Sequence, residues 1–241
     1  MTKKQSTAVE VLPVTKANKA SQKRGSGRPK QGVDDEAAMR QRIVEVARQL
    51  FATQGFASVT LRNIATEVGC SPMWIYRYFD NKYAILRAVW EDFFVELFDQ
   101  LNAIRHANPR TRLEQMSLRY LDYWLERPDR FRMVFLIEDP ATERQHSYVH
   151  SGQIVDRFKP FESAVEQARE KGLFVTAKSG LVVQGLMCLL NGLALNLITV
   201  SELPWAKKST LAPLAVNAYL DGFGPQSKRQ LSRGSLPGLM P

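Results

Sequence analysis

Apolar side chains recur along this chain at the spacing of amphipathic helices. One stripe begins at Ile43 and ends before Gly55, a residue placed to stop the helix. Similar stripes stop before Asn108–Pro109 and before Gly172. In order along the chain, the three stripes are Ile43, Val46, Ala47, Leu50 and Phe51; Leu86, Val89, Trp90, Phe93, Leu97, Leu101 and Ile104; and Ile154, Phe158, Phe161, Val165 and Ala168. No strand-like alternation competes with them, so the pattern predicts an all-α protein.

Two further segments are apolar on more than one side. The segment from about Pro109 to Glu126 carries apolar side chains on two sides, so we expect a centrally buried helix. Residues 180–200 are nearly all apolar and long enough to span a membrane. Three amide side chains in that segment favour a buried helix of a soluble protein instead, and we expect no membrane partner. They are Gln184, Asn191 and Asn196.

The segment from Thr60 to Phe79 has the pattern of two short helices joined by a tight turn. Thr60 is a suitable N-cap for the first helix, and Ser71 followed by Pro72 is a suitable start for the second. Gly69 between them can adopt the left-handed conformation that such a turn requires. The pattern predicts a helix-turn-helix over residues 61–79.

A helical wheel divides the second of these helices into two faces. Ile75 and Phe79 point inward, whereas the outward positions hold Met73, Trp74, Tyr76 and Arg77. Exposed Met, Trp and Tyr beside an Arg make a poor solvent surface but suit the reading of a DNA groove. The alternative is that another helix covers this face. Lys82 opposes the dipole of the following helix, as expected either of a binding residue or of an indifferent surface lysine.

Charge is concentrated at the two ends of the chain. The formal net charge is +9, and residues 1–33 hold eight basic side chains against Glu10 alone. We expect a flexible basic arm (1–33), a DNA-binding domain (34–82) whose first helix starts at the acidic run 34–36, a larger helical domain (83–224) and a disordered tail (225–241). Arg28 and Lys30 flank a proline as in an AT-hook, although a merely solvated tail is the alternative.

Little in the sequence indicates catalysis or cofactor binding. Cys70 and Cys188 have neither disulfide nor zinc spacing, and the opening segment lacks a signal-peptide core, so we expect a cytoplasmic protein. His146 and His150 have the i, i+4 spacing of a metal pair, but no third ligand is fixed by spacing. Because no nucleophile, zinc-protease, P-loop or dinucleotide motif is present, we expect neither an enzyme nor a cofactor.

Residues from about 40 to 90 resemble the headpiece of the TetR family. The matching positions are Ile43, Val46, Ala47, Leu50, Phe51, Gly55, Phe56, Val59, Thr60, Ile64, Ala65, Gly69, Ser71, Ile75, Tyr76, Tyr78, Phe79, Lys82 and Leu86. The resemblance implies an all-helical homodimer with a three-helix DNA-binding headpiece and a connecting helix. It also implies that the C-terminal domain (83–224) binds a small-molecule effector and dimerises through its last two helices. Members of this family are mostly repressors.

The same resemblance implies DNA contacts at particular positions. Phosphates would be bound by Thr60, Ser71, Tyr76 and Lys82, and base edges would be approached by Arg62, Pro72, Met73, Trp74 and Arg77. Met73 and Trp74 depart from the small residues common at these positions, so the operator sequence cannot be inferred. We expect guanine-type readout from Arg77.

The C-terminal half offers a pocket and an interface. Aromatic residues around Pro128 and polar residues of the long apolar segment could line a mostly apolar effector pocket, although ordinary core packing is the alternative for each. The pocket residues are Tyr120, Tyr123, Trp124, Phe131, Phe135, Gln184, Met187 and Asn191. Small and apolar stripes, Gly185 with Gly192 and Leu211, Leu214, Ala215 with Ala218, suit a four-helix dimer interface.

Together these features predict a repressor that binds an operator in double-stranded DNA and is released by an uncharged, partly aromatic or lipid-like effector. The alternative is a nucleoid-type protein that binds DNA through its basic ends without sequence preference.

Overall fold

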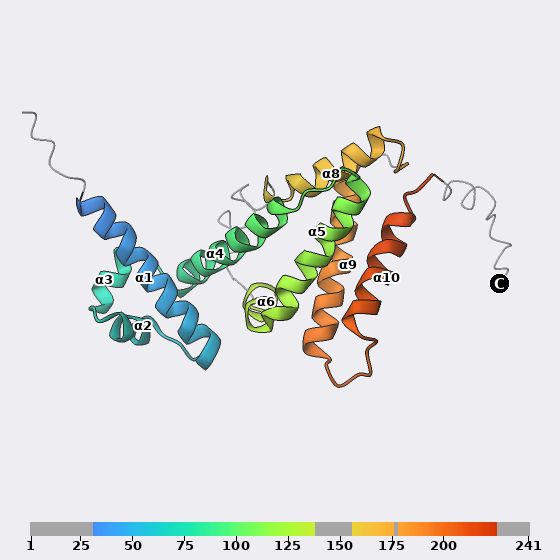
Figure 1. Ribbon diagram of the computed structural model, residues 1–241. Coiled ribbons are helices and arrows are strands. Elements are labelled where there is room, and N and C mark those ends of the chain that lie inside the picture. The colour runs from blue at the N-terminus through green and yellow to red at the C-terminus, as the bar shows by residue number, and fades with distance from the viewer. Residues whose placement is uncertain (1–30, 138–155, 176–177, 226–241) are drawn as a thin grey trace, which may run out of the picture.

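The computed structural model describes residues 31–137, 156–175 and 178–225, and every regular element in these ranges is a helix (Figure 1). This confirms the all-α fold class. The helices are α1 (Gln31–Gln54), α2 (Leu61–Val68), α3 (Pro72–Tyr76), α4 (Lys82–Ala103), α5 (Pro109–Glu126), α6 (Pro128–Phe135), α8 (Lys159–Glu170), α9 (Ser179–Thr199) and α10 (Lys208–Asp221).

Helices α1, α2 and α3 form a small headpiece at one end of the molecule, and α4 runs from it into a larger bundle (Figure 1). The predicted stripe of α1 supplies Ile43, Ala47 and Phe51 to the headpiece core, where they are buried with Ile64 and Ile75. Helix α1 begins at Gln31, ahead of the acidic run 34–36 that we expected to cap it. No proline follows Pro29 in this stretch, so nothing in the backbone stops the helix from extending to Gln31.

Helix α5 is the centre of the larger bundle and packs against α4, α6, α8, α9 and α10. Its bounds are those that the pattern predicted, and Tyr120 and Trp124 on it are fully buried. Asn108 caps this helix, because its Oδ1 accepts from the backbone N–H groups of Arg110 (2.9 Å) and Thr111 (3.2 Å). Helix α4 stops earlier, at Ala103, so Asn108 and Pro109 start α5 and do not end α4.

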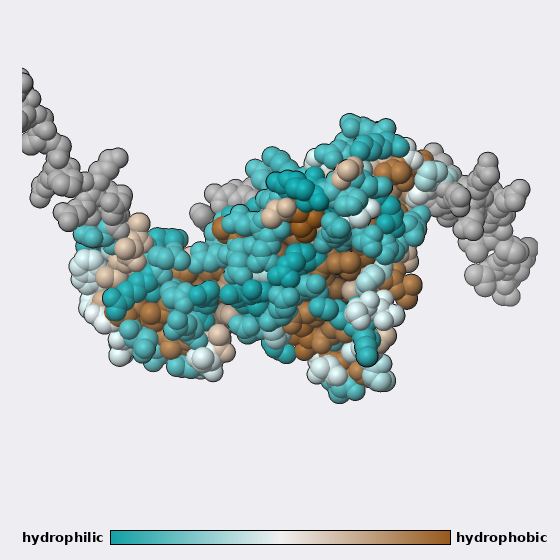
Figure 2. Space-filling view, in the orientation of Figure 1, coloured by the Kyte–Doolittle hydropathy of each residue, from teal (hydrophilic) through white to brown (hydrophobic). Residues whose placement is uncertain are grey.

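Helices α9 and α10 lie side by side at the edge of this bundle, and apolar surface is visible where they lie (Figure 2). Helix α9 is long and apolar enough to cross a membrane, but only 33% of its most apolar window is buried within the chain. Val182, Leu186 and Leu190 face the bundle, whereas Leu181 and Leu195 are exposed. An apolar face of α9 is therefore left uncovered by the described part of the chain.

Candidate nucleic-acid interface and aromatic cluster

The first helix of the helix-turn-helix is fixed by a reciprocal capping pair. The Thr60 Oγ1 accepts from the backbone N–H of Asn63 (3.2 Å), and the Asn63 Oδ1 accepts from the backbone N–H of Thr60 (2.9 Å). Sequence reading assigned the cap to Thr60 but missed Asn63, although a polar residue three positions after a cap is the signal for this motif. The threonine hydroxyl therefore has a folding role before any DNA is bound.

The turn between the helices has the predicted geometry. Gly69 has a left-handed conformation (φ 81°, ψ 36°), and its N–H donates to the carbonyls of Ala65 (3.0 Å) and Thr66 (3.1 Å). Ser71 then occupies the N-cap position of α3, and Pro72 is the first helical residue. The Ser71 hydroxyl makes no capping hydrogen bond and both residues are exposed.

The outward face of α3 is uncovered. Met73 is 74% exposed, Trp74 45% and Tyr76 53%, and Arg77 is also exposed, whereas Ile75 and Phe79 are buried. This matches the orientation expected from the helical wheel. Within the described residues no helix covers this face, which argues against the alternative interpretation. Arg62 of α2 is exposed as well.

Two outward residues of this face contact each other. The guanidinium carbon of Arg77 lies 4.7 Å from the ring centroid of Trp74. The Trp74 ring also stacks near the half-buried Tyr78, with centroids 6.5 Å apart and planes inclined by 22°. A basic residue that sequence reading missed, Arg40 of α1, lies over the Phe79 ring at 4.9 Å. Residues 40 and 79 are far apart in the sequence, so no local pattern predicted this contact.

Lys82 connects the start of α4 to the loop between α1 and α2. Its Nζ donates to the carbonyls of Phe56 (2.7 Å) and Val59 (2.8 Å), and it lies 4.2 Å from the Phe56 ring centroid. Burial lowers the pKa of this amine, while the carbonyl acceptors favour its charged form. These contacts explain why a lysine occupies the first turn of α4. A contact between Lys82 and a DNA phosphate stays a prediction. Arg28 and Lys30 lie outside the described residues.

The predicted pocket residues of α5 and α6 form one aromatic cluster around Trp124. Ring centroids of Tyr123, Phe135, Phe131 and Tyr120 lie 4.9, 5.3, 6.0 and 6.1 Å from the Trp124 ring, with edge-on geometry throughout. Phe135 is partly exposed, and the others are buried. The sequence placed these residues together correctly, because helical spacing across the Pro128 break puts them on facing sides.

A polar pair extends this cluster to α9. The Tyr120 hydroxyl donates to the Asn191 Oδ1 (2.9 Å). Burial raises the pKa of Tyr120, and the polar groups of Trp124 and Asn191 beside it offset only part of that rise. The Trp124 indole N–H is buried near this hydroxyl but lacks the geometry of a hydrogen bond to any partner among the described residues. One buried donor in the cluster is therefore unsatisfied.

Gln184 does not join this cluster, contrary to the prediction. It is exposed and lines a separate open groove with Glu166, Arg169 and Lys178. Gln184 and Asn191 share a side of α9, but seven residues separate them by about 10 Å along the helix axis. Met187, between them, is half-buried against the core. His146 and His150 lie outside the described residues, and no group of three metal-ligating side chains gathers within the part that is described.

A second, apolar groove of about 340 Å³ opens between α9 and α10. It is lined by Cys188, Leu189, Gly192, Leu193, Asn196, Leu197, Trp205 and Leu211. Gly192 has no atom within 4 Å of the position a Cβ would take, whereas a Cβ on Gly185 would overlap the Tyr219 hydroxyl. The two glycines, predicted to serve one interface, thus differ: Gly185 admits a side chain of the same chain, and Gly192 faces open space.

Comparison with known proteins agrees with this geometry. Residues 43–89 match the family described as bacterial regulatory proteins, tetR family. The chain is 36% identical over 87 residues to an HTH-type transcriptional regulator of Staphylococcus aureus (strain USA300), covering 34% of this chain and 45% of the relative. The chain therefore matches less than half the length of this curated relative.

Solved structures share the fold over a longer range. A transcriptional regulator of the TetR/AcrR family from Thermobifida fusca superposes with a TM-score of 0.59 at 17% identity, covering 77% of this chain and 98% of that one. The fatty acid degradation regulator FadR from Bacillus halodurans gives a TM-score of 0.57 at 16% identity, covering 75% and 94%. The fold and the headpiece define an all-helical protein of the helix-turn-helix class. Within this fold, residues 43–89 are a headpiece of the TetR type.

Proposed function

We propose that this protein is a sequence-specific DNA-binding transcriptional regulator that inserts α3 into the major groove of its operator. The observation that carries the proposal is the uncovered outward face of α3, where three large apolar or aromatic side chains and Arg77 are exposed. A soluble protein rarely leaves such a group uncovered unless it binds something there. A recognition helix contacts base edges through this kind of face.

The DNA contacts proposed for the headpiece divide into two kinds. Phosphate contacts are assigned to Thr60, Ser71, Tyr76 and Lys82, and the unused hydroxyl of Ser71 at the start of α3 supports its assignment. Base-edge contacts are assigned to Arg62, Pro72, Met73 and Arg77, of which Arg77 is the best candidate for guanine. Trp74 is assigned to the same DNA-facing surface without a base contact of its own. The basic residues 1–30 would supply sequence-independent attraction to phosphates.

The partner proposed for the apolar α9–α10 face is a second copy of this chain. Leu214 of α10 is 65% exposed, and the groove between α9 and α10 is lined by no charged side chain among the described residues. A two-fold arrangement of such helices buries the same face of both copies. It also presents two α3 helices to successive major grooves about 34 Å apart, which a single copy cannot do.

The proposed regulation is release from the operator when a small, uncharged, apolar or aromatic effector binds at the Trp124 cluster. Arg127 and Arg130, at the edge of this cluster, both pair with Glu96, so neither offers an unpaired charge to a ligand. The unsatisfied Trp124 N–H would gain an acceptor from a ligand carbonyl or ether oxygen. A nucleoid-type role is not favoured, because nonspecific binding through the chain ends gives no purpose to the exposed α3 face.

Selection of bound fragments from random duplex DNA by the full chain tests the proposal. We expect one enriched, approximately palindromic sequence that is preferred over unrelated DNA at salt concentrations where nonspecific binding is lost. Arg77→Ala should weaken binding to that sequence by about 1–3 kcal/mol. Arg169→Ala, which removes an equal charge from α8, is the matched control. Enrichment of no sequence would overturn the proposal.

A further inference from the structure

We propose that Trp74 is a positioning residue for Arg77: its indole face holds the guanidinium in one orientation, so that discrimination at the base pair read by Arg77 depends on Trp74. The inference rests on the proposed function and deepens it. Trp74 stands where a small residue would leave the arginine side chain free in solvent. Exposure alone gives Trp74 no role in the free protein, whereas its contact with Arg77 does.

The backbone brings these two residues together. Trp74 and Arg77 are three residues apart, so they are neighbours on one side of α3. The N–H of Arg77 donates to the carbonyl of Trp74 (3.2 Å), and the guanidinium carbon lies 4.7 Å from the indole centroid. Arg77 forms no ion pair with a carboxylate in the described part of the chain. The indole ring is therefore the group that restricts this side chain.

The indole is itself in contact with the ring of Tyr78, four residues further along the chain. Tyr78 is half-buried against the headpiece core, and its ring stacks near that of Trp74 with an inclination of 22°. The contacts thus run from the core to Tyr78, to Trp74 and then to the exposed guanidinium. These contacts restrain the Arg77 guanidinium, which would otherwise be mobile on an exposed five-residue helix.

This restriction matters because a guanidinium reads guanine with two parallel hydrogen bonds, to O6 and N7. Such readout requires the plane of the fork to match the plane of the base. A guanidinium ordered on a ring before binding loses less conformational freedom when it docks. Arginine also suits this stacking better than lysine, whose ammonium is a hydrated point charge. We therefore expect Trp74 to act on specificity more than on general attraction to DNA.

A double-mutant cycle on the selected duplex tests the inference. The probes are that duplex and single base-pair variants of it, and the proteins are the wild type, Trp74→Leu, Arg77→Ala and the double variant. Arg77→Ala should reduce discrimination at one base pair by about 5-fold to 150-fold. Trp74→Leu should lose part of the discrimination at the same base pair and none elsewhere. In the Arg77→Ala background, Trp74→Leu should change nothing further at that position.

The conservative variant separates positioning from other roles. Trp74→Phe keeps an aromatic face and should retain most of the discrimination that Trp74→Leu loses. Thermal unfolding of each variant checks that the headpiece is intact, which we expect because the side chain is 45% exposed. Additive effects of the two substitutions would show that Trp74 contacts DNA by itself and would overturn the inference. Unchanged discrimination in Arg77→Ala would instead overturn the readout proposed for Arg77.

Discussion

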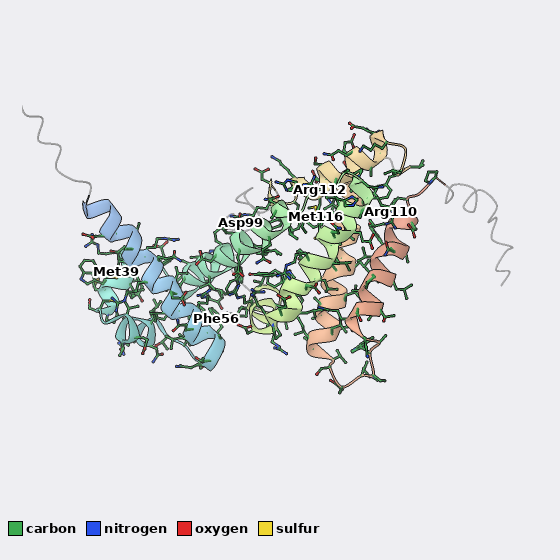
Figure 3. The ribbon with its side chains drawn as sticks, in the orientation of Figure 1. Met39, Phe56, Asp99, Arg110, Arg112 and Met116 are labelled. Atoms are coloured by element: carbon green, nitrogen blue, oxygen red, sulfur yellow. The ribbon has the colours of Figure 1, made fainter. Side chains whose placement is uncertain are left out.

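The ammonium of Lys82 donates a 2.7 Å hydrogen bond to the carbonyl of Phe56 and lies 4.2 Å from the centroid of the same residue's ring. One side chain thus joins the start of α4 to the α1–α2 loop through both the backbone and the ring of one residue. Phe56 lies where the headpiece meets α4 (Figure 3), and its ring also packs against Phe51 and Tyr83. The orientation of the headpiece on α4 therefore depends on this contact.

Lys82→Met should destabilise the headpiece by about 1–3 kcal/mol, because it leaves two partly buried carbonyl acceptors without a charged donor. Urea unfolding measures the loss. The salt dependence of DNA binding separates a second role: if Lys82 also binds a phosphate, the slope of log affinity against log salt should fall by about 1. Exposed Lys208, paired with Asp122, provides a control at which the same substitution should leave the slope unchanged. A Lys82→Met protein as stable as the wild type would contradict the structural role.

Deletion of residues 1–30, which leaves α1 complete, should weaken DNA binding and flatten its salt dependence. The reason is that most of the net positive charge lies in this segment, whereas the headpiece is nearly neutral. Affinity for the selected duplex measured across a range of salt concentrations checks this. An unaltered slope would show that the segment does not contact phosphates.

Gly185→Ala should destabilise the fold of each subunit by about 1–3 kcal/mol. A Cβ there would overlap the Tyr219 hydroxyl and approach its Cζ to 3.1 Å, which displaces the hydrogen bond from that hydroxyl to the Val182 carbonyl (2.8 Å). Gly192→Ala is the matched variant on the same helix, because the space at that position is open. We expect it to preserve the subunit fold and to weaken association of two copies. Equal thermal destabilisation by both changes would contradict the distinction.

Leu214→Asp should convert the proposed dimer to a monomer, because a carboxylate on a shared apolar face is buried without a partner. Light scattering measures the mass, and Val95→Asp, at an exposed position of α4, is the control. Loss of the dimer should also weaken binding to a palindromic duplex far more than binding to one half-site. If the wild-type chain is itself a monomer at micromolar concentration, the proposed interface is wrong.

Alkaline pH should reveal the buried Tyr120 hydroxyl. Burial raises its pKa in the folded state, so the unfolded chain loses this proton first, at a pH of about 10. Stability contributed by Tyr120 is therefore constant below that pH and falls as the pH rises above it, by at most about 1.4 kcal/mol per pH unit. The difference in unfolding free energy between the wild type and Tyr120→Phe should follow this curve. A difference that stays flat through pH 11 would contradict the burial of an unionised hydroxyl.

Local patterns in the sequence were sufficient to predict the helices and to predict which face of α3 is exposed. Helical periodicity and capping residues act over one or two turns, so Thr60, Gly69 and Pro72 could be placed correctly, and Ile75 and Phe79 set which side of α3 points inward. The same periodicity placed the aromatic residues of α5 and α6 together. The extension of α1 to Gln31 was missed, because helix ends depend on weak preferences.

Tertiary packing decided the partners of individual side chains. The sequence gives no reason for Lys82 to reach Phe56 and Val59, for Arg40 to lie over Phe79, or for Gly185 and Gly192 to face different surroundings. Each of these depends on where a second helix or loop lies. The angle and offset between two packed helices cannot be derived from the residue spacing within either helix. The nearly all-apolar composition of residues 180–200 determined that α9 must be covered. Only the packed structure decided which part of it the chain covers itself and which part it leaves open.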